Sequence, residues 1–254
     1  MQTLRQELEE FSKSNNNLRK LLIVIGDSFS WGTGMAEFTE ESVPYDYLLL
    51  EDYEIWPYHM KHNYGGYIAQ ELGFDYVNYS VPGCSNDTIY RNFMYLLENH
   101  SDWLDRAFVL IGWTANHRYE IPSPGILRSY RNMAPTWEKN IYRHTKWVCE
   151  YHELYNQHIH CSKADDIRSY NHLVSVTNIL ENNKIKNLQY WAIKQFQEDF
   201  DIKGRCTKFK NISHNINLSS ICVHNIPAEN MLPCKHPDSI GHKIISDQIL
   251  NVRY

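Results

Sequence analysis

Runs of hydrophobic residues alternate along the chain with stretches of helical periodicity. Residues 21–25 (Leu-Leu-Ile-Val-Ile) and 107–111 (Ala-Phe-Val-Leu-Ile) are apolar throughout and end next to glycine, as expected of strands buried on both faces. Residues 74–79 alternate between apolar and polar, and residues 188–193 form another short apolar segment. The pattern therefore predicts four strands.

Helical spacing occupies the segments between these strands. Residues 64–72 end at Gly73, a typical C-cap, and residues 89–97 follow three N-cap candidates, Ser85, Asn86 and Asp87. Residues 4–18 predict a helix or arm, and residues 166–181 predict a helix. Residues 238–252 predict a closing helix with four isoleucines along one side: Ile240, Ile244, Ile245 and Ile249.

The alternation of strand and helix predicts right-handed crossovers and a parallel sheet. Two segments depart from this rhythm, an acidic aromatic one around residues 35–62 and one rich in Tyr, His and Trp around 113–162. Because neither an internal repeat nor a linker is visible, we expect one domain over residues 1–254. It carries an N-terminal helical arm (1–20) and insertions at about 33–63 and 117–165.

Composition narrows the class of protein. With 43% hydrophobic and 22% charged residues, the chain of 254 residues is typical of a globular protein. A net charge of −5 without a basic stripe argues against nucleic acid as a partner, and no apolar run approaches the roughly 18 residues of a membrane span. The abundance of Asn, Ile, Lys and Tyr is compatible with an AT-rich genome, such as that of a phage or a marine microbe.

The six cysteines are scattered without a CxxC pair, and the N-terminus is polar and amphipathic. We therefore expect reduced thiols in a cytoplasmic protein, or association with a virion if a phage encodes the chain.

A serine follows the first strand directly, in Gly26-Asp27-Ser28. Such a turn exposes the hydroxyl at the carboxyl edge of the sheet, with the backbone N–H facing the same space, which suits a nucleophile beside an oxyanion. A general base is available in His236, on a loop just before the last helix.

Four blocks resemble the SGNH/GDSL hydrolase family: Gly26-Asp27-Ser28, Gly83 after the second strand, Gly112 after the third, and His236-Pro237-x-x-x-Gly241-His242. They stand in the family's order. The resemblance implies an α/β fold, a flavodoxin-like three-layer α/β/α sandwich with a central parallel sheet.

The resemblance also implies roles for individual residues. Ser28 would be the nucleophile, His236 the general base, and the backbone N–H groups of Ser28 and Gly83 two oxyanion donors. The third donor of the family is the Asn of a Gly-x-Asn-Asp motif. In this sequence the corresponding residues are Gly112-Trp113-Thr114-Ala115-Asn116, so the block departs from that motif. Register favours Thr114, whereas the amide favours Asn116, our preferred candidate.

A second departure concerns the residue that orients the histidine. The family's Asp lies three residues before the His, and Pro233 occupies that position. Glu229, Asp238 or a backbone carbonyl are the alternatives. A missing orienter also marks proteins that have lost activity.

Simpler roles compete at several positions. Ser28 is also a candidate helix N-cap, Asp27 is expected to bond within its own turn, and Arg118 is expected to pair with Glu120 or the acidic segment. A group of residues resembles a metal-ligand cluster, but its spacing matches no known zinc site, so we expect neither metal nor cofactor. These residues are His144, Tyr151, His152, His158, His160 and Cys161.

The sequence thus predicts a metal-independent serine esterase that works through an acyl-enzyme. Its aromatic, acidic surroundings favour a small-molecule or glycan ester, such as an O-acetylated sugar. The alternative is a catalytically inactive SGNH-like protein with a binding or structural role.

Overall fold

A central sheet of four parallel strands organises the chain. The computed structural model describes residues 2–14, 19–33, 60–122, 130–133, 146–192, 226–232 and 236–252. The strands are β1 (Leu21–Ile25), β2 (Asp75–Asn78), β3 (Ala107–Trp113) and β6 (Lys186–Trp191), in the order β2-β1-β3-β6. Because β6 is the fourth strand of this sheet along the chain, the order corresponds to the 2-1-3-4 order of flavodoxin-like folds.

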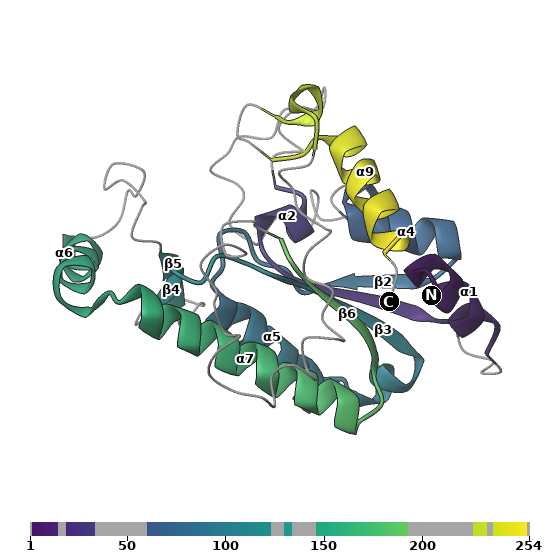
Figure 1. Cartoon of the computed structure of the whole chain (residues 1–254), viewed down its shortest axis with the longest axis horizontal. Helices are drawn as coiled ribbons and strands as arrows, with labels where there is room; N and C mark the ends of the chain where they lie inside the picture. The colour runs from purple at the N-terminus through teal and green to yellow at the C-terminus, as the bar shows by residue number, and fades with distance from the viewer. Residues whose placement is uncertain are drawn as a thin grey trace.

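Helices cover both faces of this sheet (Figure 1). On one face lie α1 (Leu4–Lys13), α4 (Tyr64–Leu72) and α9 (Ser239–Leu250), and on the other lie α5 (Asn86–Asn99) and α7 (Ser162–Asn182). The predicted three-layer α/β/α sandwich with a parallel sheet is confirmed.

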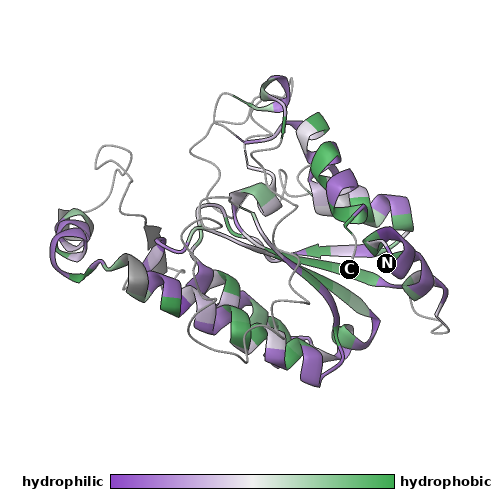
Figure 2. Cartoon of the chain, in the orientation of Figure 1, coloured by the Kyte–Doolittle hydropathy of each residue, from purple (hydrophilic) through white to green (hydrophobic). Residues whose placement is uncertain are grey.

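Hydrophobic side chains of β1 point alternately to the two faces of the sheet, so both faces are covered by helices. Leu22 and Val24 point into the cluster beneath α1, α4 and α9, whereas Ile23 and Ile25 point into the cluster beneath α5 and α7. All five β1 residues are buried, so the strand reads as a continuous apolar run. Figure 2 shows the same pattern, with hydrophobic residues along the strands and in stripes on the helices.

The remaining elements are short or lie beside the sheet. A two-stranded antiparallel sheet pairs β4 (Tyr119–Pro122) with β5 (Tyr130–Met133). The helical segments are α2 (Ser28–Trp31), η3 (Ser101–Arg106), α6 (Lys146–Leu154), η5 (Tyr155–Ile159) and η9 (Ala228–Asn230).

The four predicted strands and the helices after Asn63 and Ser85 are confirmed, with shifts of a few residues at their ends. Three details differ. Gly112 lies inside β3 instead of after it. Ile240 is 59% exposed, because it lies on the outer side of α9, and only Ile244, Ile245 and Ile249 face the core. The arm expected over residues 1–20 includes α1, whose Leu4 and Leu8 are wholly buried.

Several predictions fall on residues outside the described ranges. They concern most of the 33–63 insertion, part of the 117–165 insertion, and the helical face around residues 137–144. Within the described ranges, no helix combines the length and hydrophobicity that crossing a membrane requires.

Candidate active site

The turn after β1 carries Ser28 at the carboxyl edge of the sheet. Asp27 is the N-cap of α2, its side chain accepting a hydrogen bond from the N–H of Phe29, and Ser28 is the first helical residue. The capping role considered for Ser28 therefore belongs to Asp27, and Asp27 bonds within its own turn as predicted. The Ser28 hydroxyl is left for another partner.

That partner is His236. Its Nε2 lies 2.9 Å from the Ser28 Oγ, although the two residues are 208 positions apart. The loop that carries His236 is held by its backbone, since Leu232 N donates to His236 O at 2.7 Å and Asp238 N donates to Asn230 O at 3.0 Å. If Nε2 accepts the hydroxyl proton, the imidazole's own proton is on Nδ1.

The Phe29 ring lies 5.0 Å from the imidazole, centroid to centroid. His236 is thus held between its own loop and the first turn of α2, at the distance that a nucleophile and its base require.

Gly83 stands in a tight turn beside the serine turn. Its φ of +68° favours glycine, and Cys84 N closes the turn on Val81 O at 3.2 Å. Val81 N donates to Gly26 O at 3.0 Å, and Cys84 Sγ contacts the same oxygen at 3.3 Å. The turn with Gly83 therefore packs against the residue two positions before Ser28.

The carboxylate of Asp27 is completely buried beneath these two turns. Its Oδ2 accepts hydrogen bonds from Thr114 Oγ1 at 2.7 Å and from Arg118 Nη1 at 3.3 Å. Arg118 thus pairs with Asp27, whereas Glu120, one of its two expected partners, pairs with Arg91. The other expected partner, the acidic segment, lies almost entirely outside the described residues. Burial accounts for the pairing of Asp27 with Arg118, since a wholly buried carboxylate requires hydrogen bonds and a counter-charge.

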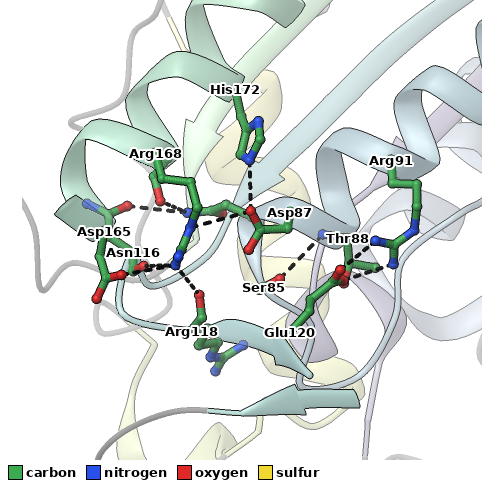
Figure 3. A network of polar contacts seen from close by, with 12 residues as sticks. Ser85, Asp87, Thr88, Arg91, Asn116, Arg118, Glu120, Asp165, Arg168 and His172 are labelled. Carbon is green, nitrogen blue, oxygen red and sulfur yellow. Dashed lines mark hydrogen bonds and ion pairs between the residues drawn. The ribbon is translucent and has the colours of Figure 1, made fainter. Parts of the chain in front are cut away.

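Asn116 is also buried, but in a neighbouring network (Figure 3). Its Nδ2 donates to Asp166 Oδ1 at 2.9 Å, and its Oδ1 accepts from Asn86 Nδ2 at 3.3 Å. Both candidates for the third oxyanion donor thus donate to a carboxylate: Asn116 to Asp166, and Thr114 to Asp27.

Two residues that shape this loop were not singled out by the sequence. Arg168 Nη2 donates to the backbone oxygens of Asn116 (3.5 Å) and Arg118 (3.1 Å), and its guanidinium pairs with Asp87 and Asp165 (Figure 3). For Asn86 the sequence predicts only a possible cap, yet its side chain donates to the backbone oxygen of Thr114 and accepts from the backbone N–H of the same residue. Neither role has a local signal, because the partners lie far away in sequence.

A network of buried hydroxyl groups contacts Ser30 in α2. Tyr64 donates to Ser30 Oγ at 2.7 Å and is hydrogen-bonded to Tyr190. Burial raises the pKa of both phenols, so they remain neutral hydrogen-bonding groups. A Cβ on Gly26 would lie 2.1 Å from Ser30 Oγ, so glycine is required for this close approach.

The candidates for orienting His236 differ in position. Glu229 is exposed in η9, while Asp238 is the N-cap of α9, its Oδ1 accepting from Gly241 N at 2.7 Å. Pro233, the departure from the family pattern, lies outside the described residues.

His242, the other histidine of this block, is wholly buried and stacks on Tyr64, in keeping with the packing role of its helix.

Two histidines of the group that resembles a metal-ligand cluster bind other side chains. His152 Nδ1 is hydrogen-bonded to the Tyr119 hydroxyl, and His160 Nε2 lies 3.1 Å from Asp165 Oδ2. Over the described part of the chain, no three His, Cys, Asp or Glu side chains are grouped so as to hold a metal ion. His144 lies outside that part.

Comparison with known proteins shows which family the chain belongs to. The model of one protein family, described as "Family of unknown function (DUF6071)", matches residues 48–231. The chain belongs to the DUF6071 family. The matched span lies between Ser28 and His236 and includes neither. A comparison of the DUF6071 chain with curated proteins found no match.

The DUF6071 chain is similar to several solved structures. A member of the lipolytic protein G-D-S-L family from Veillonella parvula is 14% identical, with a TM-score of 0.46, and the match covers 91% of this chain and 97% of that one. The psychrotrophic esterase EstA from a Pseudoalteromonas species is 12% identical, with a TM-score of 0.45 and coverages of 91% and 94%. A GDSL-like lipase from Bacteroides thetaiotaomicron is 12% identical, with a TM-score of 0.41 and coverages of 97% and 94%. They include members of the family whose blocks this sequence resembles.

Proposed function

We propose that this protein is a serine ester hydrolase in which Ser28 is the nucleophile and His236 the general base. The observation that carries the proposal is the 2.9 Å contact between Ser28 Oγ and His236 Nε2. A serine hydroxyl is a weak nucleophile until an adjacent base takes its proton, and this is the distance at which the transfer operates.

The reaction proceeds in two halves. Ser28 Oγ attacks the ester carbonyl while its proton passes to His236 Nε2, and the tetrahedral intermediate collapses as the imidazolium protonates the leaving alcohol. A water, deprotonated by His236, then attacks the acyl-enzyme and releases the acid and Ser28. The charged oxygen accepts hydrogen bonds from the backbone N–H groups of Ser28 and Gly83.

For the third oxyanion donor we keep Asn116 ahead of Thr114. An amide nitrogen carries two N–H donors, so Asn116 can donate to Asp166 and still offer a second hydrogen. The hydroxyl of Thr114 has a single proton, which it gives to Asp27. The substrate that we favour is a small acyl ester, such as an O-acetylated sugar, in view of the aromatic and acidic segments of the sequence.

Hydrolysis of para-nitrophenyl acetate and butyrate tests the proposal, together with labelling by a fluorophosphonate read as intact mass. We expect saturable turnover and one adduct on Ser28. Ser28→Ala and His236→Ala should each lower kcat by about 10³-fold or more. Ser12→Ala and His158→Ala are matched controls at exposed positions and should leave kcat unchanged.

A folded wild-type protein that neither turns over nor labels, on these esters or on acetylated xylan, would contradict the proposal. The non-catalytic binding or structural role would then be favoured.

A further inference from the structure

Arg118 bridges the two turns that carry the proposed oxyanion amides. Its Nη1 donates both to Asp27 Oδ2 (3.3 Å) and to Cys84 O (3.1 Å). Asp27 directly precedes Ser28, and Cys84 directly follows Gly83. One guanidinium nitrogen therefore contacts the chain next to each of the two amide donors.

Thr114 supplies a second link to the same carboxylate. Its hydroxyl donates to Asp27 Oδ2 at 2.7 Å, and its own N–H is held by Asn86 Oδ1 at 2.9 Å. The contact joins the loop after β3 to the loop after β1. These two strands are neighbours in the sheet, and their last paired residues are Ile25 and Ile111. It ties the serine turn to the adjacent strand at the carboxyl edge.

We propose that Thr114 and Arg118 are positioning residues that act through Asp27, setting the place of Ser28 and the spacing of the Ser28 and Gly83 amides. This inference rests on the proposed hydrolase function. Asp27 is wholly buried, so its charge is tolerated only with hydrogen bonds and a counter-charge, and these two side chains provide them. The carboxylate in turn accepts from Phe29 N in the first turn of α2.

Positioning makes a prediction about Thr114 that packing does not. Thr114→Val keeps the volume but removes the hydroxyl, whereas Thr114→Ser keeps the hydroxyl and removes a methyl group. We expect Thr114→Val to lower kcat by about 10- to 100-fold, since the lost bond is made to a charged acceptor, with KM within about twofold of wild type. Thr114→Ser should retain most of kcat.

The rate of fluorophosphonate labelling should follow kcat in both variants, because labelling reports the placement of Ser28. A pure packing role would give the reverse order of the two variants.

A double-mutant cycle with Asp27→Ala separates positioning from direct oxyanion binding. If Thr114 acts through Asp27, then adding Thr114→Val to Asp27→Ala should change kcat by less than about twofold. If the two losses multiply, Thr114 touches the substrate itself and the inference is wrong. Should Asp27→Ala fail to fold, Asp27→Ser, which removes the carboxylate but keeps an N-cap residue for α2, replaces it in the cycle, with the same non-multiplying result expected.

The outcomes separate this inference from the function on which it rests. An active wild type whose Thr114→Val variant is folded and fully active overturns only the positioning role. A wild type that neither turns over nor labels overturns the hydrolase function, and the positioning role with it.

Discussion

Two glycines of the described chain share one positive φ angle but have different surroundings. Gly73 and Gly83 both have a φ of +68°. Gly73 is the C-cap of α4 at the amino edge of the sheet, where a Cβ would meet nothing within 4 Å. Gly83 lies in the turn that packs against Gly26, at the carboxyl edge. Comparing substitutions at these two glycines therefore separates the effect of backbone strain on stability from the effect of a displaced Gly83 amide on catalysis.

Replacing each glycine by alanine should therefore give different results. Both substitutions place an L-residue in the left-handed region, which costs about 1–2 kcal/mol of unfolding free energy. Only Gly83→Ala should also lower kcat, toward the roughly 10²- to 10³-fold loss of a whole oxyanion donor. Urea unfolding and para-nitrophenyl acetate turnover measure the two effects. Equal kcat in both variants would contradict a role for the Gly83 amide.

At the candidate site, the sequence predicted that Ser28 and His236 meet, but not the contacts of the residues around them. Ser28 and His236 are recognisable because each stands in a local block, and the fold brings the two blocks to the same edge of the sheet. The choice between Thr114 and Asn116, and the partner of Arg118, depend on which carboxylates are buried nearby. That is a property of the packed sheet edge, and no spacing along the chain encodes it.

At the scale of elements, the N-terminus of α5 and the first turns of α7 hold the loop after β3. Asp87, in the first turn of α5, pairs with Arg168 and accepts from His172 Nε2 at 2.9 Å (Figure 3). Arg168 in turn donates to the backbone of Asn116 and Arg118. The loop beside the candidate active site is thus anchored to two helices by charge-assisted hydrogen bonds.

The contribution of Asp87 to stability should depend on pH. Burial opposes the ionised form, but the hydrogen bond from His172 and the charge of Arg168 outweigh it, so the pKa of Asp87 is lowered. A lowered pKa means that the stabilisation is present above the unfolded value of about 3.9 and is lost as pH falls through the folded pKa.

Asp87→Asn should therefore destabilise the fold by about 1–2 kcal/mol at pH 7 and by progressively less below about pH 4. Urea unfolding of variant and wild type at several pH values measures the gap. Asp102→Asn, at an exposed position in η3, is the control and should show no such gap. A gap for Asp87→Asn that is independent of pH would mean that the ion pairs contribute nothing.

Elements were predictable where one periodicity dominates. β1 reads as an apolar run because helices cover both of its faces, and α4 ends where Gly73 supplies its left-handed cap. The β4 and β5 hairpin was missed because each strand has four residues and lies outside the main sheet. Helical periodicity predicts one stripe of four isoleucines on α9, but Ile240, the first of them, lies on the exposed face of the helix.

At the scale of the whole molecule, the sheet separates two cores, and α1 completes one of them. Leu4 and Leu8 are wholly buried in the cluster that also contains Ile245 and Ile249 of α9. Leu4 N donates to Val252 O at 2.8 Å, which joins the two ends of the described chain. In Figure 1, α1 lies beside α9 and α4, away from α2 and the serine turn. The first helix thus belongs to the core and lies apart from the proposed site.

Leu8→Ala should consequently lower stability without altering chemistry. Removing a wholly buried leucine costs about 2–5 kcal/mol, because the surrounding core collapses only partly around the cavity. Glu10→Ala, on the exposed side of the same helix, should change the unfolding free energy by no more than about 0.5 kcal/mol. Urea unfolding measures both, and kcat per folded molecule should equal that of wild type, since α1 packs on α4 and α9. If Leu8→Ala instead lowered kcat while the protein stayed folded, the two ends of the sheet would be coupled, and the separation of core from site would be wrong.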